Sequence, residues 1–385
     1  MTTKINNEHN KLNVPNLRFK EFQREWEKTK FGDIAIVVGG GTPDTNTSQY
    51  WNGKIQWFTP SEIGRNKYVY NSVRTISEEG LNKSSAKLLP IGTILLSSRA
   101  TVGECSINKK ECTTNQGFQS LIPKENISNE FVYYLIQTKR KDLIRKSCGS
   151  TFLEISANEI RKIVVSIPTI KEQDKIAKLL SLLDERIATQ NKIIEDLKKL
   201  KSAISKKLLC NDKWATYKIQ DIAEIGRGRV ISSVEINRQK NPLYPVYSSQ
   251  TSNNGIMGYL DNYMFDGEYI TWTTDGANAG TVFYRKGKFN CTNVCGTLKI
   301  QPKFDCYFVS LVLQQATQKY VSSNLANPKL MNNTMASIKI KMPNIETQKQ
   351  LSKVFQALDG CLSIHQRTCE MYLKEKQYLL RQMFI

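Results

Sequence analysis

The residues best suited to catalysis are few in this sequence and poorly grouped. Its two histidines, His9 and His365, stand far apart, and imidazole is the side chain most often used in general acid–base chemistry. The closest cysteine pair is Cys291-x3-Cys295, and with only two histidines available it does not predict a zinc site. The nine cysteines form no CxxC pair, which favours reduced, buried thiols in a cytoplasmic protein. We therefore expect no metal and no catalytic residue.

Sequence motifs for cofactors are also missing. There is no GxxxxGK[ST] phosphate loop, and Gly226-x-Gly228 is followed by Ile231 where a dinucleotide fingerprint needs glycine. No metal-dependent nuclease pattern with a convincing carboxylate-x-Lys pair is found, and the Asn-Pro-Pro motif of amino-methyltransferases is absent too. We expect a binding protein without a cofactor, whose partners supply any catalysis.

The overall charge indicates what such a protein binds. Lys and Arg number 55 against 35 Asp and Glu, giving a net charge of +20 and a pI near 9.5. A charge of this size favours a polyanion, because counterion release supplies much of the affinity. A basic ribosomal-type protein or a membrane-surface protein is the alternative. No apolar run reaches spanning length and no separate basic amphipathic helix stands out, so nucleic acid is the preferred interpretation.

Polar side chains that could contact nucleic acid gather in predicted loops. Arg or Lys can read guanine and Asn or Gln can read adenine, while contacts to phosphate fix the register. The candidates in the first half are Thr42, Thr45, Ser48, Gln49, Lys54, Arg65, Ser97, Ser98, Arg99, Thr114, Asn115 and Gln116. Those in the second half are Arg227, Arg229, Ser248, Ser249, Gln250, Thr251, Thr273, Thr274, Thr292 and Asn293.

Each of these loops has a simpler explanation as a solvated turn. Trp51, Trp57 and Trp272 are more simply explained as core aromatics. Thr114-Asn115 corresponds to Thr292-Asn293, and an Asn in a tight turn can serve only the backbone. Because base readers should differ between the halves, residues that are not repeated are the better specificity candidates. The glycine between Arg227 and Arg229 would let the backbone approach phosphate.

Two long helices are expected to position these loops, and they repeat each other. Pro168 and Pro343 stand 175 positions apart, and the same offset relates Gln173 to Gln348 and Lys201 to Lys376. After each proline an alternating three- and four-residue apolar spacing predicts a coiled-coil seam. Its members include Ile176, Leu180, Leu183, Ile187 and Gln190 in the first helix, and Leu351, Phe355, Leu358, Leu362 and His365 in the second.

Polar residues interrupt both stripes at equivalent places. If the helices run antiparallel and overlap fully, Gln190 lies opposite His365 and fixes their register at some cost in stability. Both residues could equally lie in water at the edge of the seam. Replacing both by Leu should stabilise the pair and loosen its register.

The fold class follows from this arrangement. The chain is expected to be α+β, with two mixed, strand-rich domains related by pseudo-two-fold symmetry and separated by two long antiparallel helices. The start of each domain repeats as well, Lys30 and Asp33 matching Lys218 and Asp221, and short helices are expected at Glu130–Lys146 and Cys306–Val321. The expected boundaries are a mobile arm at 1–16, domains at 17–167 and 212–342, and helices at 168–211 and 343–385.

These motifs together resemble the DNA-specificity (S) subunit of type I restriction–modification systems, along essentially the whole chain. Leu17-Arg18-Phe19-x2-Phe22-x3-Trp26 looks like that family's entry sequence. Gly40-Gly41-Thr42-Pro43 with Tyr50-Trp51-x-Gly53 is similar to one type of recognition domain, and Tyr244-Pro245-Val246-Tyr247 with Gly255-Ile256-Met257-Gly258-Tyr259 to another. The order and duplication of the motifs carry the resemblance more than any single one.

The resemblance implies a function for each part. Each domain would read one half of a bipartite double-stranded DNA target, and the helices would set the spacing between the halves. A helix of nearly forty residues spans about 55 Å, compared with about 34 Å for one DNA turn. The helices would also dock two methyltransferase subunits that bind S-adenosylmethionine. Two ATP-dependent translocase–endonuclease subunits would complete the assembly.

Two other classes of protein stay open at this point. A single-chain or fragmentary modification–restriction enzyme would need cofactor motifs, and the sequence carries none. A pseudo-dimeric DNA-binding regulator is disfavoured because no compact helix-turn-helix signal is present.

Overall fold

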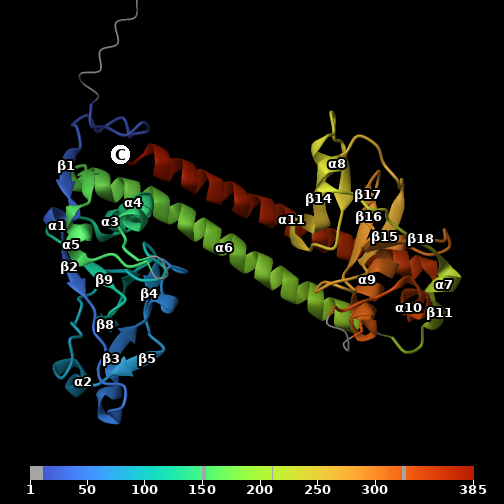
Figure 1. Ribbon diagram of the computed structural model, residues 1–385, viewed down its shortest axis with the longest axis horizontal. Helices are drawn as coiled ribbons and strands as arrows, with labels where there is room; N and C mark the ends of the chain where they lie inside the picture. Colours follow the sequence, from blue (N-terminus) through green and yellow to red (C-terminus); the bar gives the residue numbers. More distant parts are fainter. Residues whose placement is uncertain (1–11, 150–152, 210, 323–326) are drawn as a thin grey trace, which may run out of the picture. The chain divides into compact units, whose positions relative to one another are not determined.

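The computed structural model describes residues 12–149, 153–209, 211–322 and 327–385 (Figure 1). Most of the expected N-terminal arm lies outside these residues, as do His9 and Cys210. The described end of the arm is held in place, because the Asn13 side-chain amide donates to the Trp26 carbonyl at 2.5 Å. The chain divides into two compact units, Met1–Gln190 with Thr368–Ile385, and Asn191–Arg367. Each long helix therefore contributes one part to each unit.

The first unit is built on a five-stranded sheet in the order β2-β9-β6-β7-β4 and a three-stranded sheet in the order β5-β3-β8. Serine N-caps begin α2 and α5, since the Ser77 and Ser156 side chains each accept the backbone N–H of the third helical residue. The elements are β1 (Glu27–Lys30), α1 (Phe31–Ile34), β2 (Ala35–Gly39), η1 (Ser48–Tyr50), β3 (Trp51–Phe58), η2 (Pro60–Glu62), β4 (Tyr68–Val69), β5 (Arg74–Ile76), α2 (Glu78–Asn82), β6 (Ile94–Leu96), β7 (Cys105–Asn108), β8 (Cys112–Thr114), β9 (Gln119–Pro123), α3 (Asn129–Thr138), α4 (Arg140–Arg145), α5 (Ala157–Lys162) and β10 (Val164–Ile167).

The second unit has a four-stranded sheet in the order β12-β18-β15-β16 and a three-stranded sheet in the order β14-β13-β17. Helix α9 packs on the larger sheet (Figure 1). Its Phe308 and Leu313 belong to the same buried core cluster as Trp272 and Leu298 of the sheet. The elements are β11 (Ala215–Lys218), α7 (Ile219–Ile222), β12 (Ala223–Arg227), α8 (Ser233–Asn237), β13 (Tyr244–Tyr247), η3 (Ser252–Gly255), β14 (Ile256–Leu260), β15 (Glu268–Thr273), β16 (Val282–Lys286), β17 (Asn290–Cys291), β18 (Cys295–Ile300), α9 (Cys306–Ala316), η4 (Thr317–Tyr320), α10 (Asn332–Ser337) and β19 (Lys339–Met342).

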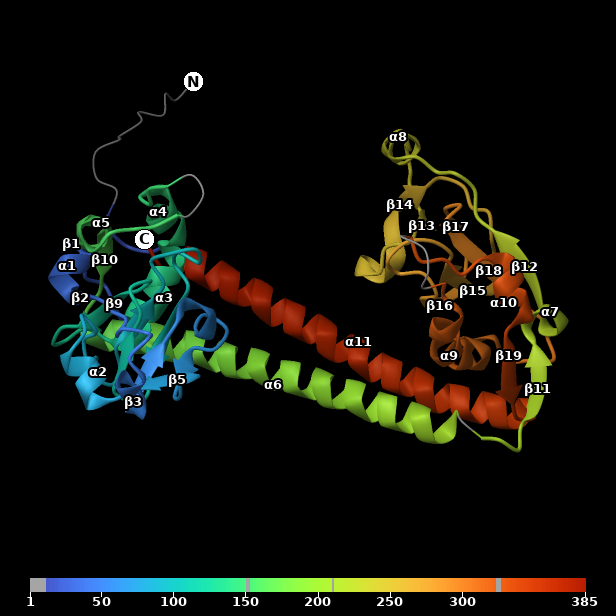
Figure 2. The ribbon, with the colours of Figure 1, turned by 60° about the horizontal axis from the view of Figure 1, so that its bottom comes forward.

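The two units repeat the same framework, which we call the frame: a two-stranded antiparallel sheet and a helix that packs against a tryptophan. Strand β1 pairs antiparallel with β10, and β11 pairs in the same way with β19 beside the start of α11 (Figure 2). Trp26 packs edge-on against Phe131 at 6.0 Å between ring centroids, and Trp214 packs against Phe308 at 5.9 Å. The repetition also reaches the domain interiors, because β3 pairs in parallel with β8 and β13 with β17. The structure thus extends a repeat that the sequence shows only at the edges of the domains.

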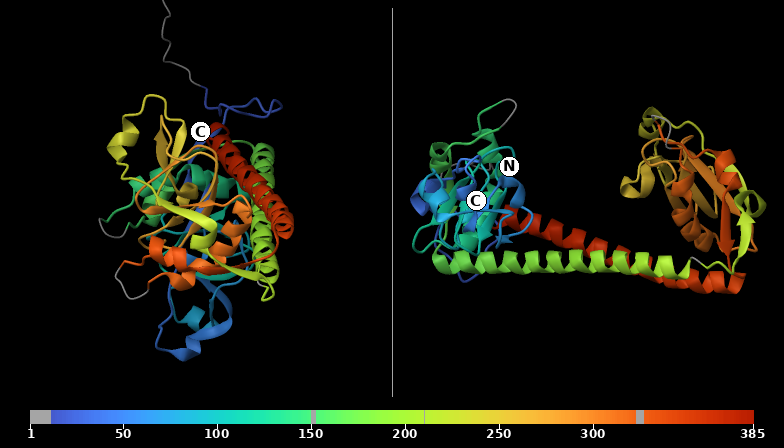
Figure 3. Two further views of the ribbon diagram at one scale, coloured as in Figure 1. Left: turned by 90° about the vertical axis from the view of Figure 1, so that its right-hand side faces the viewer. Right: turned by 90° about the horizontal axis from the view of Figure 1, so that it is seen from below.

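The two expected long helices are present. They are α6 (Ile170–Leu208), of 39 residues, and α11 (Ile345–Gln382), of 38 residues. The predicted seam residues named above are all buried or half-buried, with Phe355 and Leu180 at 0% exposure. The end of α11 lies in the first unit (Figure 3). Just after it, Phe384 stacks on Phe131 at 5.2 Å between ring centroids. The expected short helices appear as α3 with α4 and as α9 with η4.

Candidate nucleic-acid interface

Three predicted residues of the second unit meet at one end of its larger sheet. The Arg227 guanidinium, at the end of β12, donates to the Asn293 carbonyl at 2.6 Å and to the Thr274 hydroxyl at 3.1 Å. Thr273 and Thr274 are buried, whereas Arg227 and Asn293 are exposed. The Arg227 guanidinium and the Asn293 side-chain amide therefore face solvent next to the buried threonines. Such a pair can bind phosphate or a base edge.

Arg229 is exposed beside this group and is already paired. Its guanidinium bonds the Glu235 carboxylate of α8, with one N–O distance of 3.0 Å. The hydrogen bond raises the pKa of Arg229 and lowers the pKa of Glu235. Arg229 must share or leave this carboxylate before it can bind a phosphate.

The predicted equivalence of the two Thr-Asn pairs was wrong by one residue. The Asn115 N–H donates to the Phe58 carbonyl at 3.0 Å, next to the parallel pairing of β3 with β8. In the second unit it is the Thr292 N–H that makes the same bond, to the Tyr247 carbonyl at 2.9 Å. Asn293 therefore has a different position from Asn115, and the two asparagines are not structural repeats.

Gly40 and Gly228 have equivalent structural roles in the two units. A Cβ on Gly40 would lie 1.9 Å from the Asn115 carbonyl oxygen, and one on Gly228 would lie 2.1 Å from that of Cys291. Only glycine allows the two chain segments to pass this closely. The packing explains Gly228 without the approach to phosphate that the sequence suggested.

The segment Ser248–Gly255 forms a closed turn in the second unit. The Ser248 N–H donates to the Gly255 carbonyl at 2.8 Å, and the Gln250 side-chain amide donates to the Ile256 carbonyl. The Asn278 side chain donates to the Ser249 carbonyl at 3.1 Å. Gln250 is thereby engaged in holding the turn, and Thr251 is the exposed member of the predicted Ser248–Thr251 group.

In the first unit the structure gathers a second predicted group. The Thr42 hydroxyl bonds the Gln116 side chain, and the Asn115 side chain accepts the Gly117 N–H at 2.9 Å. The Ser98 N–H donates to the Gly117 carbonyl at 2.8 Å, which brings Ser98 under the same loop. Gln116 is exposed, and Thr114 is buried beneath it.

Ser97 and Ser98 are fully buried, so their side chains support the loop and do not face solvent. The next residue, Arg99, is exposed and pairs with Glu154 at 2.8 Å. Ala100 follows with a φ of 57°, a left-handed conformation rare for alanine. Arg99 is thus presented at a tightly bent corner with its charge partly compensated.

The remaining first-unit candidates are exposed and spread more widely. Asp44 organises the loop before β3: its side chain accepts the Asn46 N–H at 3.0 Å and its carbonyl accepts the Trp51 indole N–H at 3.0 Å. Thr45, Ser48 and Gln49 lie in that loop, Lys54 lies on β3, and Arg65 follows η2. No described hydrogen bond or ion pair joins these residues to the Thr42–Gln116 group.

The tryptophans are buried, as the simpler explanation predicted. Trp51 and Trp57 meet edge to face at 5.0 Å, and Trp272 is 0% exposed. The exposed Arg74 lies 3.6 Å above the Trp51 ring. Arg74 is not among the residues predicted from the sequence, because nothing near it in the sequence indicates that it stacks on a ring 23 positions earlier. Asn253 and Asn254 are not among them either, although the Asn-Asn-Gly run is a turn signal.

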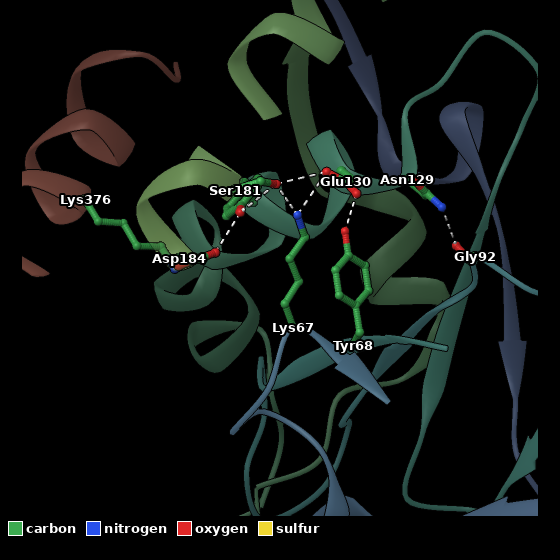
Figure 4. Close-up of polar contacts among 9 residues, drawn as sticks. Lys67, Tyr68, Gly92, Asn129, Glu130, Ser181, Asp184 and Lys376 are labelled. Atoms are coloured by element: carbon green, nitrogen blue, oxygen red, sulfur yellow. Dashed lines mark hydrogen bonds and ion pairs between the residues drawn. The ribbon is translucent and has the colours of Figure 1, made fainter. Parts of the chain in front are cut away.

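A polar network joins the first domain to the long helices within the first unit (Figure 4). The Lys67 ammonium bonds Glu130 of α3 at 2.9 Å and also contacts Ser181 of α6. Burial lowers the pKa of Lys67, and three tyrosine rings surround the ammonium. The Tyr68 hydroxyl donates to the second Glu130 oxygen. The network fixes the domain to α6 without using any of the candidate DNA-contacting residues.

A family model for the type I restriction modification DNA specificity domain matches this chain twice, over residues 23–199 and 211–370. The chain belongs to the type I DNA-specificity family. This confirms the resemblance found in the sequence and the interpretation of the chain as a specificity protein instead of an enzyme.

Individual relatives agree with this assignment. The specificity subunit of the type I restriction enzyme MjaIX from Methanocaldococcus jannaschii is 40% identical over 181 residues, covering 46% of this chain and 42% of the relative. A Mycoplasma pneumoniae protein named as a type I specificity subunit is 35% identical over 229 residues, covering 58% of this chain and 95% of the relative. The crystal structure of a type I S subunit from M. genitalium has a TM-score of 0.70 at 17% identity, covering 97% of this chain and 99% of that one.

That crystal structure supports the fold prediction for the specificity family. The fold of this chain, with its mixed domains and two long helices, is similar to that of the S subunit over nearly the whole length of both chains. None of the described helices has an apolar stretch long enough to cross a bilayer. The described residues also contain no group of three His, Cys, Asp or Glu side chains that could hold a metal ion.

Proposed function

We propose that this chain is the DNA-specificity subunit of a type I restriction–modification complex, and that each domain reads one half of a bipartite double-stranded DNA sequence. The observation that carries the proposal is that the frame is the same in both units, whereas the exposed polar side chains at the ends of their sheets differ. The frame repeats, with β1·β10 matched by β11·β19 and α3 matched by α9. The exposed polar groups differ, with Gln116 and Arg99 in one unit and Arg227 and Asn293 in the other. A common frame with different exposed groups suits two different half-sites.

The electrostatics support a DNA target. A net charge of +20 provides the non-specific affinity on which base contacts add discrimination. Buried Ser97, Ser98 and Thr274 position their neighbours in this proposal, and the exposed Arg99, Gln116, Arg227 and Asn293 make the contacts.

The helices are proposed to dock the partners. Apolar side chains are exposed along both, including Leu182 at 49%, Met371 at 56% and Tyr378 at 58% in the first unit and Leu200 at 48% and Val354 at 46% in the second. Exposed apolar side chains in such number are typical of a surface that a partner covers. By the family resemblance, the partners are two methyltransferase subunits that bind S-adenosylmethionine and two ATP-dependent translocase–endonuclease subunits. We propose that the complex forms in the cytoplasm.

The proposal is tested by expressing the chain with a methyltransferase partner and mapping adenine methylation over genomic DNA. We expect one asymmetric motif made of two specified parts separated by unspecified bases. A continuous motif, or methylation without any motif, would overturn the proposal.

Exchange of the second domain provides the matched control. Replacing residues 212–342 by the same region of another family member should change one half of the motif and leave the other half and the spacing unchanged. Isolated chain should bind no S-adenosylmethionine, as measured by calorimetry, because the proposal places that cofactor on the methyltransferase.

A further inference from the structure

The tip of the Ser248–Gly255 turn has an unusual backbone. Asn253 has φ and ψ of 49° and 40°, Asn254 has 52° and 26°, and Gly255 follows with a φ of 83°. Three consecutive left-handed residues are rare, because this conformation brings Cβ close to the following carbonyl oxygen. Asparagine tolerates it better than other side chains with a Cβ, and such conformations cluster at functional sites.

The strained tip presents two amides to solvent. Asn253 and Asn254 are both exposed, and neither side chain has a hydrogen-bond partner among the residues that the structure describes. The Ser248–Gly255 backbone bond and the Gln250 side chain close the turn below them. The backbone that carries the two amides is therefore held in place, and the amides themselves are not used by the fold.

A buried guanidinium lies directly beneath the tip. Arg285, on β16, is 6% exposed, and a Cβ built on Gly255 would lie 3.2 Å from its Nη2. Its Nε donates to the Thr271 hydroxyl at 3.1 Å, and the group stacks 3.5 Å from the centre of the Tyr247 ring. Tyr247 is the last residue before the turn, so one side chain contacts both the entry and the end of it.

No described carboxylate forms an ion pair with Arg285, whose titratable neighbours are Tyr247, Cys291 and Cys295. Burying an unpaired charge is costly, and stacking on Tyr247 and Phe283 offsets only part of that cost. An apolar side chain would fill the same space with less penalty. The presence of a cation here indicates a role beyond packing.

We propose that Asn253 and Asn254 are base-reading residues of the second domain, and that Arg285 is the positioning residue that holds them. The base is adenine in the major groove, since an asparagine amide can bond its N6 and N7 together. The inference rests on the proposed function and deepens it by naming the reader and the base class. In the alternative, the two asparagines only form a tight turn and touch nothing.

Glycine substitution separates these two interpretations. Asn253→Gly and Asn254→Gly keep the left-handed backbone accessible and remove only the amides. Asn262→Gly is the matched control, because Asn262 is exposed just beyond the far end of β14 from the tip. Arg285→Lys keeps the charge and loses the planar fork that stacks on Tyr247.

The test uses the full chain in complex with its methyltransferase partner and measures relative binding to a library of DNA duplexes. We expect the double Asn253→Gly, Asn254→Gly variant to lose at least 10-fold of its preference for adenine at one or two positions of one half-site. The other half-site and the thermal midpoint should stay unchanged. Arg285→Lys should weaken the preference at the same positions, and Asn262→Gly should behave as the wild type.

The outcomes are distinguishable. If wild-type protein shows no bipartite preference, the proposed function and this inference both fail. If the wild type is bipartite and the double asparagine variant keeps its preferences, only the inference is overturned. An equal loss for all sequences would also overturn it, since that pattern indicates phosphate contact. If Arg285→Lys lowers the thermal midpoint but leaves base preference intact, the positioning role is overturned.

Discussion

Asp184 of α6 and Lys376 of α11 form an ion pair of 2.6 Å in the first unit (Figure 4). The Tyr134 hydroxyl donates to the other Asp184 oxygen at 2.7 Å. The second unit has the same arrangement with the helices exchanged. Asp359 of α11 accepts Lys201 of α6 and the Tyr307 hydroxyl at 2.6 Å. The repeat offset of 175 relates Asp184 to Asp359 and Lys201 to Lys376. The two repeated lysines thus join each long helix to the other.

The tyrosines that complete these two groups are not repeats of each other. Tyr134 lies in the second turn of α3, whereas Tyr307 lies in the first turn of α9. In the first unit the corresponding first-turn residue is Glu130, which bonds Ser181 at 3.0 Å. The aspartate therefore obtains a tyrosine partner in both units from different places on the domain helix.

The ion pair of Asp184 with Lys376 should be measurable by a double-mutant cycle. Both side chains are about one-fifth exposed, so the pair is only partly screened by solvent. Asp184→Asn should lower the free energy of unfolding by about 2 kcal/mol, because hydrogen bonds to charged groups contribute about 1.5–3 kcal/mol. Lys376→Met should cost much less in the Asp184→Asn variant than in the wild type. Denaturant unfolding of the four proteins measures the coupling.

A matched pair on the helix surface serves as the control. Glu195 and Lys199 form an i,i+4 pair in which both side chains are mostly exposed. Glu195→Gln should leave the unfolding midpoint unchanged. Strict additivity of Asp184→Asn and Lys376→Met would contradict the predicted pairing.

Two repeated glutamines should anchor the domains to the long helices. Gln173 is 1% exposed, accepts the Ser128 N–H at 2.9 Å and donates to the Pro168 carbonyl at 2.9 Å. Gln173→Leu leaves both backbone groups without this partner, so we expect a loss of about 2 kcal/mol in the free energy of unfolding. Gln348→Leu should act alike, because Gln348 bonds the Asp305 N–H and the Pro343 carbonyl.

Gln366→Leu on the exposed face of α11 is the control for this prediction, and thermal unfolding is the measurement. If Gln173→Leu and Gln366→Leu lower the midpoint equally, the anchoring role is wrong. If only one of Gln173 and Gln348 matters, the two domains are attached by different contacts.

Much of this fold could be predicted because helix periodicity depends only on nearby residues, and a repeat with a constant offset is visible in the sequence itself. The stripe from Ile176 and the match of Gln173 to Gln348 are of this kind. The partners of those residues could not be found in the same way. Asp184 meets Lys376 across 192 positions, and nothing near either residue indicates the other. The error of one residue at Thr292 has the same cause, since the register of β17 is set by its pairing with β13.

The candidate interface was predictable to a lesser extent. Polar turns are visible in sequence, but burial decides which side chain of a turn faces solvent. Ser98 and Arg99 are neighbours, and only Arg99 is exposed. Gln190 and His365 belong to different units. Their predicted pairing is not tested by contacts within either unit and stays a prediction.

Acid should weaken the Glu130 network. Burial opposes ionisation of Glu130, but hydrogen bonds from Tyr68, Lys67 and Ser181 outweigh it and lower the pKa of the carboxyl below its usual 4.5. A carboxyl with a depressed pKa contributes stability above its unfolded pKa and loses it as pH falls through the folded one. The pKa of Lys67 is also lowered, because at the ammonium the cost of burial exceeds the gain from Glu130.

The comparison of wild type with Glu130→Gln isolates this group from the other carboxyls. We expect the wild type to be more stable near pH 7 and the difference to shrink as pH falls below about 4.5. Urea unfolding at several pH values measures it. A difference that is constant between pH 7 and pH 3 would show that Glu130 does not contribute through its charge.

Glu154 should restrain Arg99 from binding DNA. The two side chains pair at 2.8 Å and are each 46% exposed, so a phosphate or a base edge must compete with the carboxylate for the guanidinium. Glu154→Gln should therefore tighten DNA binding a few-fold at low salt, because it removes the competing charge. Glu159→Gln removes a charge from a carboxylate on α5 of the same unit whose side chain is 34% exposed, and it controls for the change in net charge.

Arg99→Ala then identifies what the guanidinium contacts. Loss of preference at one base position, by about 1–3 kcal/mol, indicates a base edge. An equal weakening for all sequences, with a salt slope reduced by about one, indicates phosphate. Fluorescence anisotropy over a salt series measures these effects together with those of the two glutamate variants. Equal gains in affinity from Glu154→Gln and Glu159→Gln would show that only net charge matters and that Arg99 does not contact DNA through this corner.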